Sequence, residues 1–99
     1  MIQDYSIEVM KAFPNSPVFG LYWSASLTHD YLNLARHADI PHLNYLKQLK
    51  EIGALNKTIL LFISDHGLRW GSIRSTYVGI LEERLPFVFM VVPPWFKQK

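Results

Sequence analysis

Hydrophobic positions along the chain predict three helices, over residues 3–12, 40–52 and 72–84. In each range apolar side chains recur about every three or four positions, which is the spacing of one face of a helix. Asp39 is a candidate N-cap for the second helix, and Gly53 suits the cap at its C-terminal end. Gly79 lies inside the third range and weakens that helix.

Three apolar runs, at residues 17–23, 58–63 and 87–92, predict strands. Every position of the middle run is hydrophobic or β-branched, which is typical of a strand that helices cover on both faces. The order of helices and strands predicts an α/β fold, with helices packed on a mainly parallel sheet.

Composition adds that this is an apolar chain for its size. Its length of 99 residues corresponds to one domain. Of these residues, 49% are hydrophobic and 18% are charged. Because a small domain buries a smaller share of its surface than a large one, we expect exposed apolar side chains. The chain has no cysteine, which excludes disulfides and thiolate chemistry.

Charge and hydropathy exclude two classes of partner, nucleic acid and the membrane interior. The formal net charge is +2 and the basic residues are scattered, so no nucleic-acid partner is predicted. The longest apolar runs are too short for a transmembrane segment. The first residues do not form a signal peptide, and no pattern indicates an oligomeric state.

Asp65 and His66 directly follow the run at 58–63 and are the first candidates for chemistry. In open α/β sheets ligands bind beyond the carboxyl ends of the strands. A carboxylate and an imidazole offer oxygen and nitrogen ligands to a divalent cation, provided that the chain turns at Asp65. Gly67 permits such a turn. The alternative is an ordinary turn, because Asp and Gly are common in loops that follow strands.

The segment from Ile59 to Gly67 resembles the metal-ligand strand of the alkaline-phosphatase/sulfatase superfamily. Nearly the whole chain is similar, in order, to the sulfatase-like family catalogued as domain of unknown function 229. The segments that carry the likeness are Leu21-Tyr22-Trp23, Ser26-Leu27-Thr28-His29-Asp30, Gly53-Ala54-Leu55-Asn56-Lys57-Thr58, Ser64-Asp65-His66-Gly67, Arg69, Gly71, Ile73-Arg74, Gly79, Leu81 to Phe87 and Pro93-Pro94-Trp95-Phe96.

The resemblance implies that residues 1–99 form a single incomplete domain with part of a three-layer α/β/α fold. It implies that Asp65 and His66 ligate a divalent metal, which the sequence does not identify among Zn, Mn and Ca. In the superfamily the nucleophile and a neighbouring carboxylate belong to an N-terminal half that this chain lacks. No catalytic nucleophile is therefore assigned here.

Three further residues are candidates for binding an anionic ester substrate. His29 matches a pocket histidine that, in related enzymes, contacts the transferred anionic group or a second metal; the alternative is a turn histidine beside Asp30. Arg69 and Arg74 could neutralise oxyanions. Their alternatives are plain surface charge or ion pairs with Glu82 and Glu83. His37 and His42 are interpreted as solvated, and the tryptophan and phenylalanine residues as packing residues.

The sequence therefore predicts a fragment of a metal-dependent sulfatase/phosphatase-like hydrolase that is inactive alone. The alternative is a non-catalytic, truncated or degenerate relative that serves as a binding module. Asn56-Lys57-Thr58 fits the N-glycosylation sequon, which makes Asn56 a candidate glycosylation site. By the family resemblance, we expect an extracellular or secretory-pathway location.

Overall fold

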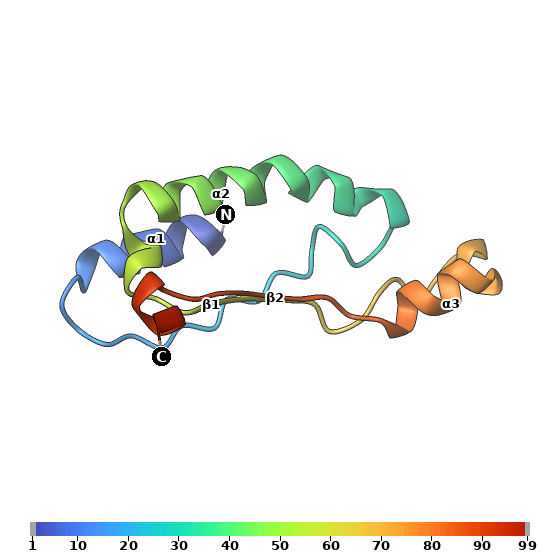
Figure 1. Ribbon diagram of the computed structural model, residues 1–99. Helices are drawn as coiled ribbons and strands as arrows, with labels where there is room; N and C mark the ends of the chain where they lie inside the picture. The colour runs from blue at the N-terminus through green and yellow to red at the C-terminus, as the bar shows by residue number, and fades with distance from the viewer. Residues whose placement is uncertain (1, 99) are drawn as a thin grey trace.

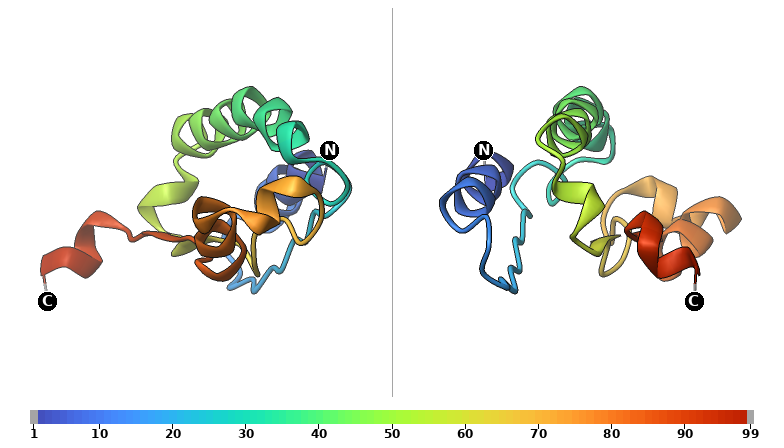
Figure 2. Two further views of the ribbon diagram at one scale, coloured as in Figure 1. Left: turned by 90° about the vertical axis from the view of Figure 1, so that its right-hand side faces the viewer. Right: turned by 60° about the vertical axis from the view of Figure 1, so that its left-hand side comes forward.

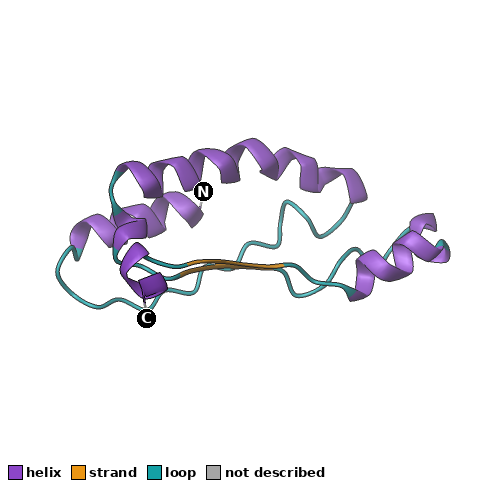
Figure 3. Ribbon diagram, in the orientation of Figure 1, coloured by secondary structure: helices purple, strands orange, loops and turns teal. Residues whose placement is uncertain are grey.

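A computed structural model describes residues 2–98 of the chain as an open arrangement of short elements (Figure 1). Its α-helices are α1 (Ile2–Ala12), α2 (Asp39–Glu51) and α3 (Tyr77–Arg84), and its strands are β1 (Leu60–Ile63) and β2 (Val88–Val91). Short 3-10 segments are η1 (Leu32–Ala38), η2 (Ala54–Asn56), η3 (Ser72–Ser75) and η4 (Pro94–Gln98). Long loops join several of these elements (Figure 3).

The predicted three-layer α/β/α fold with a mainly parallel sheet is wrong. β1 and β2 pair antiparallel, with Leu60 opposite Val91 and Ile63 opposite Val88, and within residues 2–98 the sheet has these two strands. The predicted strand at 17–23 is not formed; that segment has neither helical nor strand structure. The strand predictions at 58–63 and 87–92 are confirmed in part: β1 covers the last four residues of the first run, and β2 the middle four of the second.

The pairing is antiparallel because the chain leaves the end of β1, forms η3 and α3, and then enters β2 beside that same end, with Ile63 opposite Val88. Hydrogen bonds prolong the pairing beyond the strands: the Ser64 amide donates to the Phe87 carbonyl at 3.1 Å, and the Phe87 amide donates to Ser64 Oγ at 3.0 Å. A parallel pair would need a crossover that reaches the opposite end of the sheet.

The first two helix predictions are confirmed by α1 and α2, but the predicted N-cap is wrong. Asp39 is the first residue of α2, Ala38 occupies the N-cap position, and no side chain caps the helix there. The preceding turn, η1, leads directly into α2 and replaces a separate cap. Gly53 follows the helix with φ of 71°, the left-handed conformation expected at a helix C-terminus.

The third predicted helix is divided in two by Thr76. This residue is extended, and its side chain accepts a hydrogen bond from the Gly79 amide at 3.0 Å, which caps α3. Gly79 is buried, and a Cβ at this position would collide with the carbonyl of Ile73. Glycine therefore allows α3 to fold back closely on η3.

The core lies where α1, α2 and η2 meet. Ile7, Leu49 and Ala54 are its buried members, and Leu60 of β1 packs against them. Ser6 Oγ and the Tyr45 hydroxyl, 2.9 Å apart, join α1 to α2. In Figure 1, α1 and α3 lie at opposite ends of the molecule, and the right-hand view of Figure 2 shows them on opposite sides of α2.

His42 is part of this packing, which corrects its interpretation as a solvated residue. It is half-buried; its Nδ1 donates to the Ala38 carbonyl at 2.6 Å and its Nε2 is 3.0 Å from Gln3 Nε2. Its ring meets Phe62 edge-on, with centroids 5.1 Å apart. His42 therefore connects α2 with both α1 and β1.

One face of the two-stranded sheet is left uncovered. Its side chains are all apolar and between 46% and 65% exposed: Leu61, Ile63, Val88 and Met90. The radius of gyration is 16.1 Å, against about 13 Å for a compact domain of this length. Helices therefore cover at most one face of β1, although its sequence is typical of a strand covered on both.

None of the helices in residues 2–98 is long and apolar enough to cross a membrane.

Candidate functional site

The first candidate site lies on the loop that leaves β1, residues 64–71, which we call the site loop. At its beginning, Ser64 forms hydrogen bonds with Phe87, the residue directly before β2. Further along, the Gly67 amide donates to the carbonyl of Glu83, in the last turn of α3, at 3.2 Å. The loop is therefore fixed at two points that flank Asp65 and His66.

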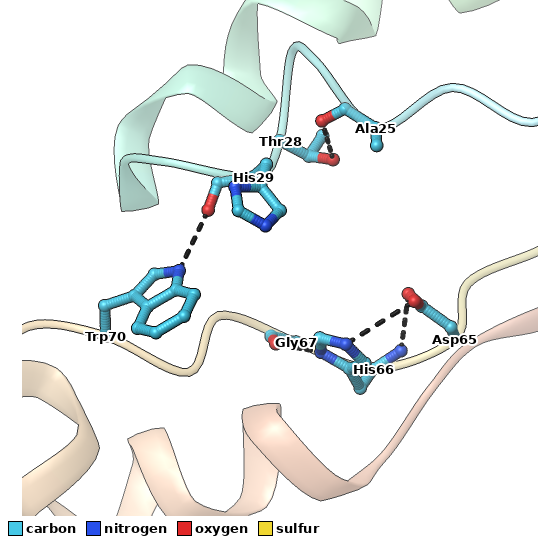
Figure 4. Close-up of polar contacts among 7 residues, drawn as sticks. All are labelled: Ala25, Thr28, His29, Asp65, His66, Gly67 and Trp70. Atoms are coloured by element: carbon cyan, nitrogen blue, oxygen red, sulfur yellow. Dashed lines mark hydrogen bonds and ion pairs between the residues drawn. The ribbon is translucent and has the colours of Figure 1, made fainter.

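The side chains of Asp65 and His66 point to one another rather than to opposite sides of the sheet (Figure 4). Asp65 Oδ2 lies 3.4 Å from His66 Nε2. Asp65 Oδ1 accepts a hydrogen bond of 2.8 Å from the His66 amide, which turns the carboxylate toward the imidazole. Both side chains are solvent-accessible, with exposed fractions of 54% and 36%.

The other ring nitrogen of His66 fixes the imidazole. Nδ1 lies 2.7 Å from the Gly67 carbonyl oxygen, and because that oxygen can only accept, Nδ1 carries a proton. In the neutral ring the lone pair of Nε2 therefore faces the carboxylate. A backbone carbonyl on the second nitrogen is a common way to orient a metal-binding histidine.

Hydrogen bonding also keeps Asp65 in its charged form. The His66 amide donates to the carboxylate and lowers the pKa of Asp65 below its ordinary value, and the positive charge of Arg69 acts in the same direction. The carboxylate is thus available as an anionic ligand at neutral pH.

These two residues fit a divalent cation, but they are too few to enclose one. Two ligands that are each about 2.0–2.2 Å from a tetrahedral ion lie about 3.3–3.6 Å apart, close to the distance between Asp65 Oδ2 and His66 Nε2. No group of three or more His, Cys, Asp or Glu side chains within residues 2–98 is arranged to hold a metal. A tightly bound ion therefore needs ligands besides this pair.

Gly67 allows close packing at this site and does not adopt a left-handed conformation. Only Gly53 and Gly71 have positive φ angles among the described glycines. A Cβ on Gly67 would collide with the Glu82 carbonyl oxygen and lie 2.7 Å from the carbonyl carbon. Glycine at this position lets the site loop lie directly against the backbone of α3.

Gly67→Ala is expected to destabilise the protein by about 1–3 kcal/mol, because the backbone of the loop or of α3 must move. Urea denaturation followed by circular dichroism measures the loss. Gly20→Ala is the matched control, since the atoms nearest to a Cβ there belong to the side chain of Tyr22 rather than to backbone. Equal stability of the two variants would show that α3 does not pack on Gly67 in solution.

His29 lies on a separate loop opposite the site loop. Figure 4 shows its ring on the side that faces Asp65 and His66. His29 Nδ1 is 2.8 Å from Asp30 Oδ1, and the indole Nε1 of Trp70 donates to the His29 carbonyl at 3.1 Å. The structure thus brings His29 to the same region as the pair and also shows the contact with Asp30.

The two arginines differ in how firmly they are held. Arg74 Nε lies 3.0 Å from Glu83 Oε2, so this guanidinium forms one of the ion pairs considered from the sequence. Arg69 is exposed on the site loop.

Asn56 is also exposed, at the end of η2, and its carbonyl accepts a hydrogen bond of 3.2 Å from the Trp95 indole.

Sequence reasoning missed Trp70, which it treated as a packing residue. Trp70 is 55% exposed, and its ring centroid lies 5.9 Å from that of His29. Its partner is 41 residues away in the chain, so no local pattern could reveal the contact. Its position four residues after His66 was the one available signal.

Comparison with known families gives one match, over residues 1–99, to a family described as "Protein of unknown function (DUF229)". No curated protein and no solved structure matches the chain.

Proposed function

Because this chain belongs to the DUF229 family, we propose that it is part of a metal-dependent hydrolase of the alkaline-phosphatase/sulfatase type, inactive alone. The observation that carries the proposal is the distance of 3.4 Å between Asp65 Oδ2 and His66 Nε2. The resemblance of the surrounding sequence to a metal-ligand strand also supports it. The substrate class is an anionic ester, a phosphate or a sulfate.

Asp65 and His66 hold two ligand atoms ready, and the rest of the loop maintains them. The His66 amide orients the carboxylate, the Gly67 carbonyl orients the imidazole, and Glu83 of α3 anchors the loop. Neither side chain needs a large movement to face a shared ion. A bound divalent cation would supply Lewis-acid catalysis at an ester oxygen.

Two other residues of this chain would contact the anionic part of the substrate. Arg69 follows the pair on the same exposed loop and offers charge-assisted hydrogen bonds to oxyanions. His29 would contribute a ring nitrogen from the opposite loop. Arg74 is the weaker candidate, because its Nε already pairs with Glu83. By the superfamily resemblance, the nucleophile and the remaining ligands come from polypeptide outside these 99 residues.

A non-catalytic binding module is the alternative. It is favoured by the uncovered apolar face of β1 and β2 and by the absence of a third ligand within residues 2–98. The metal, Zn, Mn or Ca, and an extracellular or secretory location stay predictions.

The purified 99-residue protein is expected to bind a divalent cation but not to hydrolyse 4-nitrophenyl phosphate or 4-nitrophenyl sulfate. Binding is measured by calorimetry with Zn²⁺, Mn²⁺ and Ca²⁺, and turnover by release of nitrophenol. If none of the three cations binds, the proposal is overturned. Turnover that disappears in Asp65→Ala would exclude the non-catalytic alternative and show that the chain is active alone.

A further inference from the structure

The loop that carries His29 has little regular structure of its own. We call residues 25–31 the histidine loop. A turn stabilises its first half, in which the Thr28 amide donates to the Ala25 carbonyl at 3.0 Å. His29 itself has 62% of its side chain exposed and forms its side-chain contact with its neighbour Asp30. These local contacts do not determine how far His29 lies from the site loop.

Trp70 supplies a link between the two loops. Its indole Nε1 donates to the His29 carbonyl at 3.1 Å, and its ring lies against the His29 imidazole at a centroid distance of 5.9 Å and an angle of 60°. The indole N–H can only donate, and a carbonyl oxygen can only accept, so the polarity of this bond is fixed. Trp70 therefore contacts both the backbone and the side chain of His29.

The end of this link on the site loop is itself anchored. Trp70 lies three residues after Gly67, whose amide donates to the Glu83 carbonyl and whose backbone packs on α3. A side chain that extends from an anchored loop to a loosely held one restricts the loosely held one. Figure 4 shows the result, with Trp70 beneath the His29 carbonyl and the His29 ring facing the pair.

We propose that Trp70 is a positioning residue that holds His29 opposite Asp65 and His66. The proposal deepens the proposed function and rests on it, since it concerns the placement of a third polar side chain at the same site. The indole N–H sets the position of the histidine loop, and the indole ring limits the orientations of the imidazole. Trp70 need not touch the substrate for this role.

Trp70→Phe tests the proposal, because phenylalanine keeps an aromatic ring and removes the N–H donor. Trp95→Phe is a closely matched control: the Trp95 indole donates to a backbone carbonyl, that of Asn56, at 3.2 Å, and Trp95 is 51% exposed. Both tryptophans are half exposed, so both variants are expected to fold, which circular dichroism checks.

The first readout is backbone order without metal, measured by ¹⁵N heteronuclear NOEs. The histidine loop, residues 25–31, is expected to lose order in Trp70→Phe and to keep it in Trp95→Phe. The second readout is paramagnetic broadening of ring protons by Mn²⁺, which falls steeply with distance from the ion. The His29 ring signals should broaden in the wild type and in Trp95→Phe, and lose that broadening in Trp70→Phe.

Two outcomes separate the possible failures. If Mn²⁺ broadens His66 in every variant and His29 behaves alike in all of them, the role of Trp70 is wrong and the proposed function stands. If calorimetry shows that Mn²⁺ binds to the wild type but His66 stays unbroadened, the ion does not lie at Asp65 and His66. The proposed function is then overturned, and the role of Trp70 at that site is overturned with it.

Discussion

Asp65→Asn is expected to weaken Zn²⁺ binding by about 100-fold or more, since loss of groups that merely orient metal ligands already costs about 10–100-fold. The substitution removes the negative charge and replaces a ligand oxygen, while the remaining carbonyl oxygen can still accept the hydrogen bond from the His66 amide. Because more than half of the Asp65 side chain is exposed, the fold should not change. Isothermal calorimetry at fixed pH and buffer measures the difference.

Asp39→Asn provides the control for this experiment. Asp39 is also an exposed aspartate, but it lies at the start of α2 and not on the site loop. The control removes the same charge from the chain, so it corrects for a general electrostatic effect on cation binding. A similar loss of affinity in both variants would mean that Zn²⁺ binds through net charge rather than at the Asp65–His66 pair.

Leu49→Ala is expected to destabilise the protein by about 2–5 kcal/mol, the cost of removing a large buried aliphatic side chain. Leu49 is 1% exposed and lies among Ile7 and Ala54 at the junction of α1, α2 and η2. Few other side chains in the described part of the chain are buried, so few others contribute to the stability of the core. A loss of this size therefore approaches the total stability of a small domain.

Urea denaturation of the wild type, Leu49→Ala and Leu43→Ala measures the effect. Leu43 lies on the same helix and is 44% exposed, so the same substitution leaves a much smaller cavity there. Leu49→Ala should lower the denaturation midpoint strongly and Leu43→Ala slightly. Equal shifts would indicate that α1 does not pack on α2 in solution.

The helices were predictable because their signals are local. The repeat of apolar residues identified α1 and α2 within a residue or two of their observed ends, and Gly53 marked the end of α2. The break at Thr76 was missed because it depends on contact between Gly79 and the backbone of Ile73, which periodicity does not encode.

The sheet was predicted in part, since an apolar run shows that a strand is favourable but not what it pairs with. Most of the run at 58–63 forms β1, yet the apolar and aromatic segment at 17–23 pairs with no strand and forms none. The direction of pairing followed from the path of residues 64–87, whose turns were not foreseen. Apolarity on both faces of β1 also gave no information about whether helices would cover them.

The candidate site could be proposed from the sequence, but the contacts that hold its residues in place could not. Asp65 and His66 are adjacent and follow a strand, so the pattern is visible in the chain. The Glu83 carbonyl, which anchors the loop of the pair, and the Trp70 indole, which contacts His29, both act between segments far apart in the sequence. Arg74 is also close to the motif in sequence, but its guanidinium forms an ion pair with Glu83.

The core and the acid–imidazole pair share no residues, and this separation has an evolutionary consequence. Ile7, Leu49 and Ala54 hold the helices together without help from Asp65 or His66. A lineage that needed only a folded scaffold could lose either polar residue by drift at little cost in stability. Persistence of both side chains in descendants of this gene would therefore record selection for their chemistry.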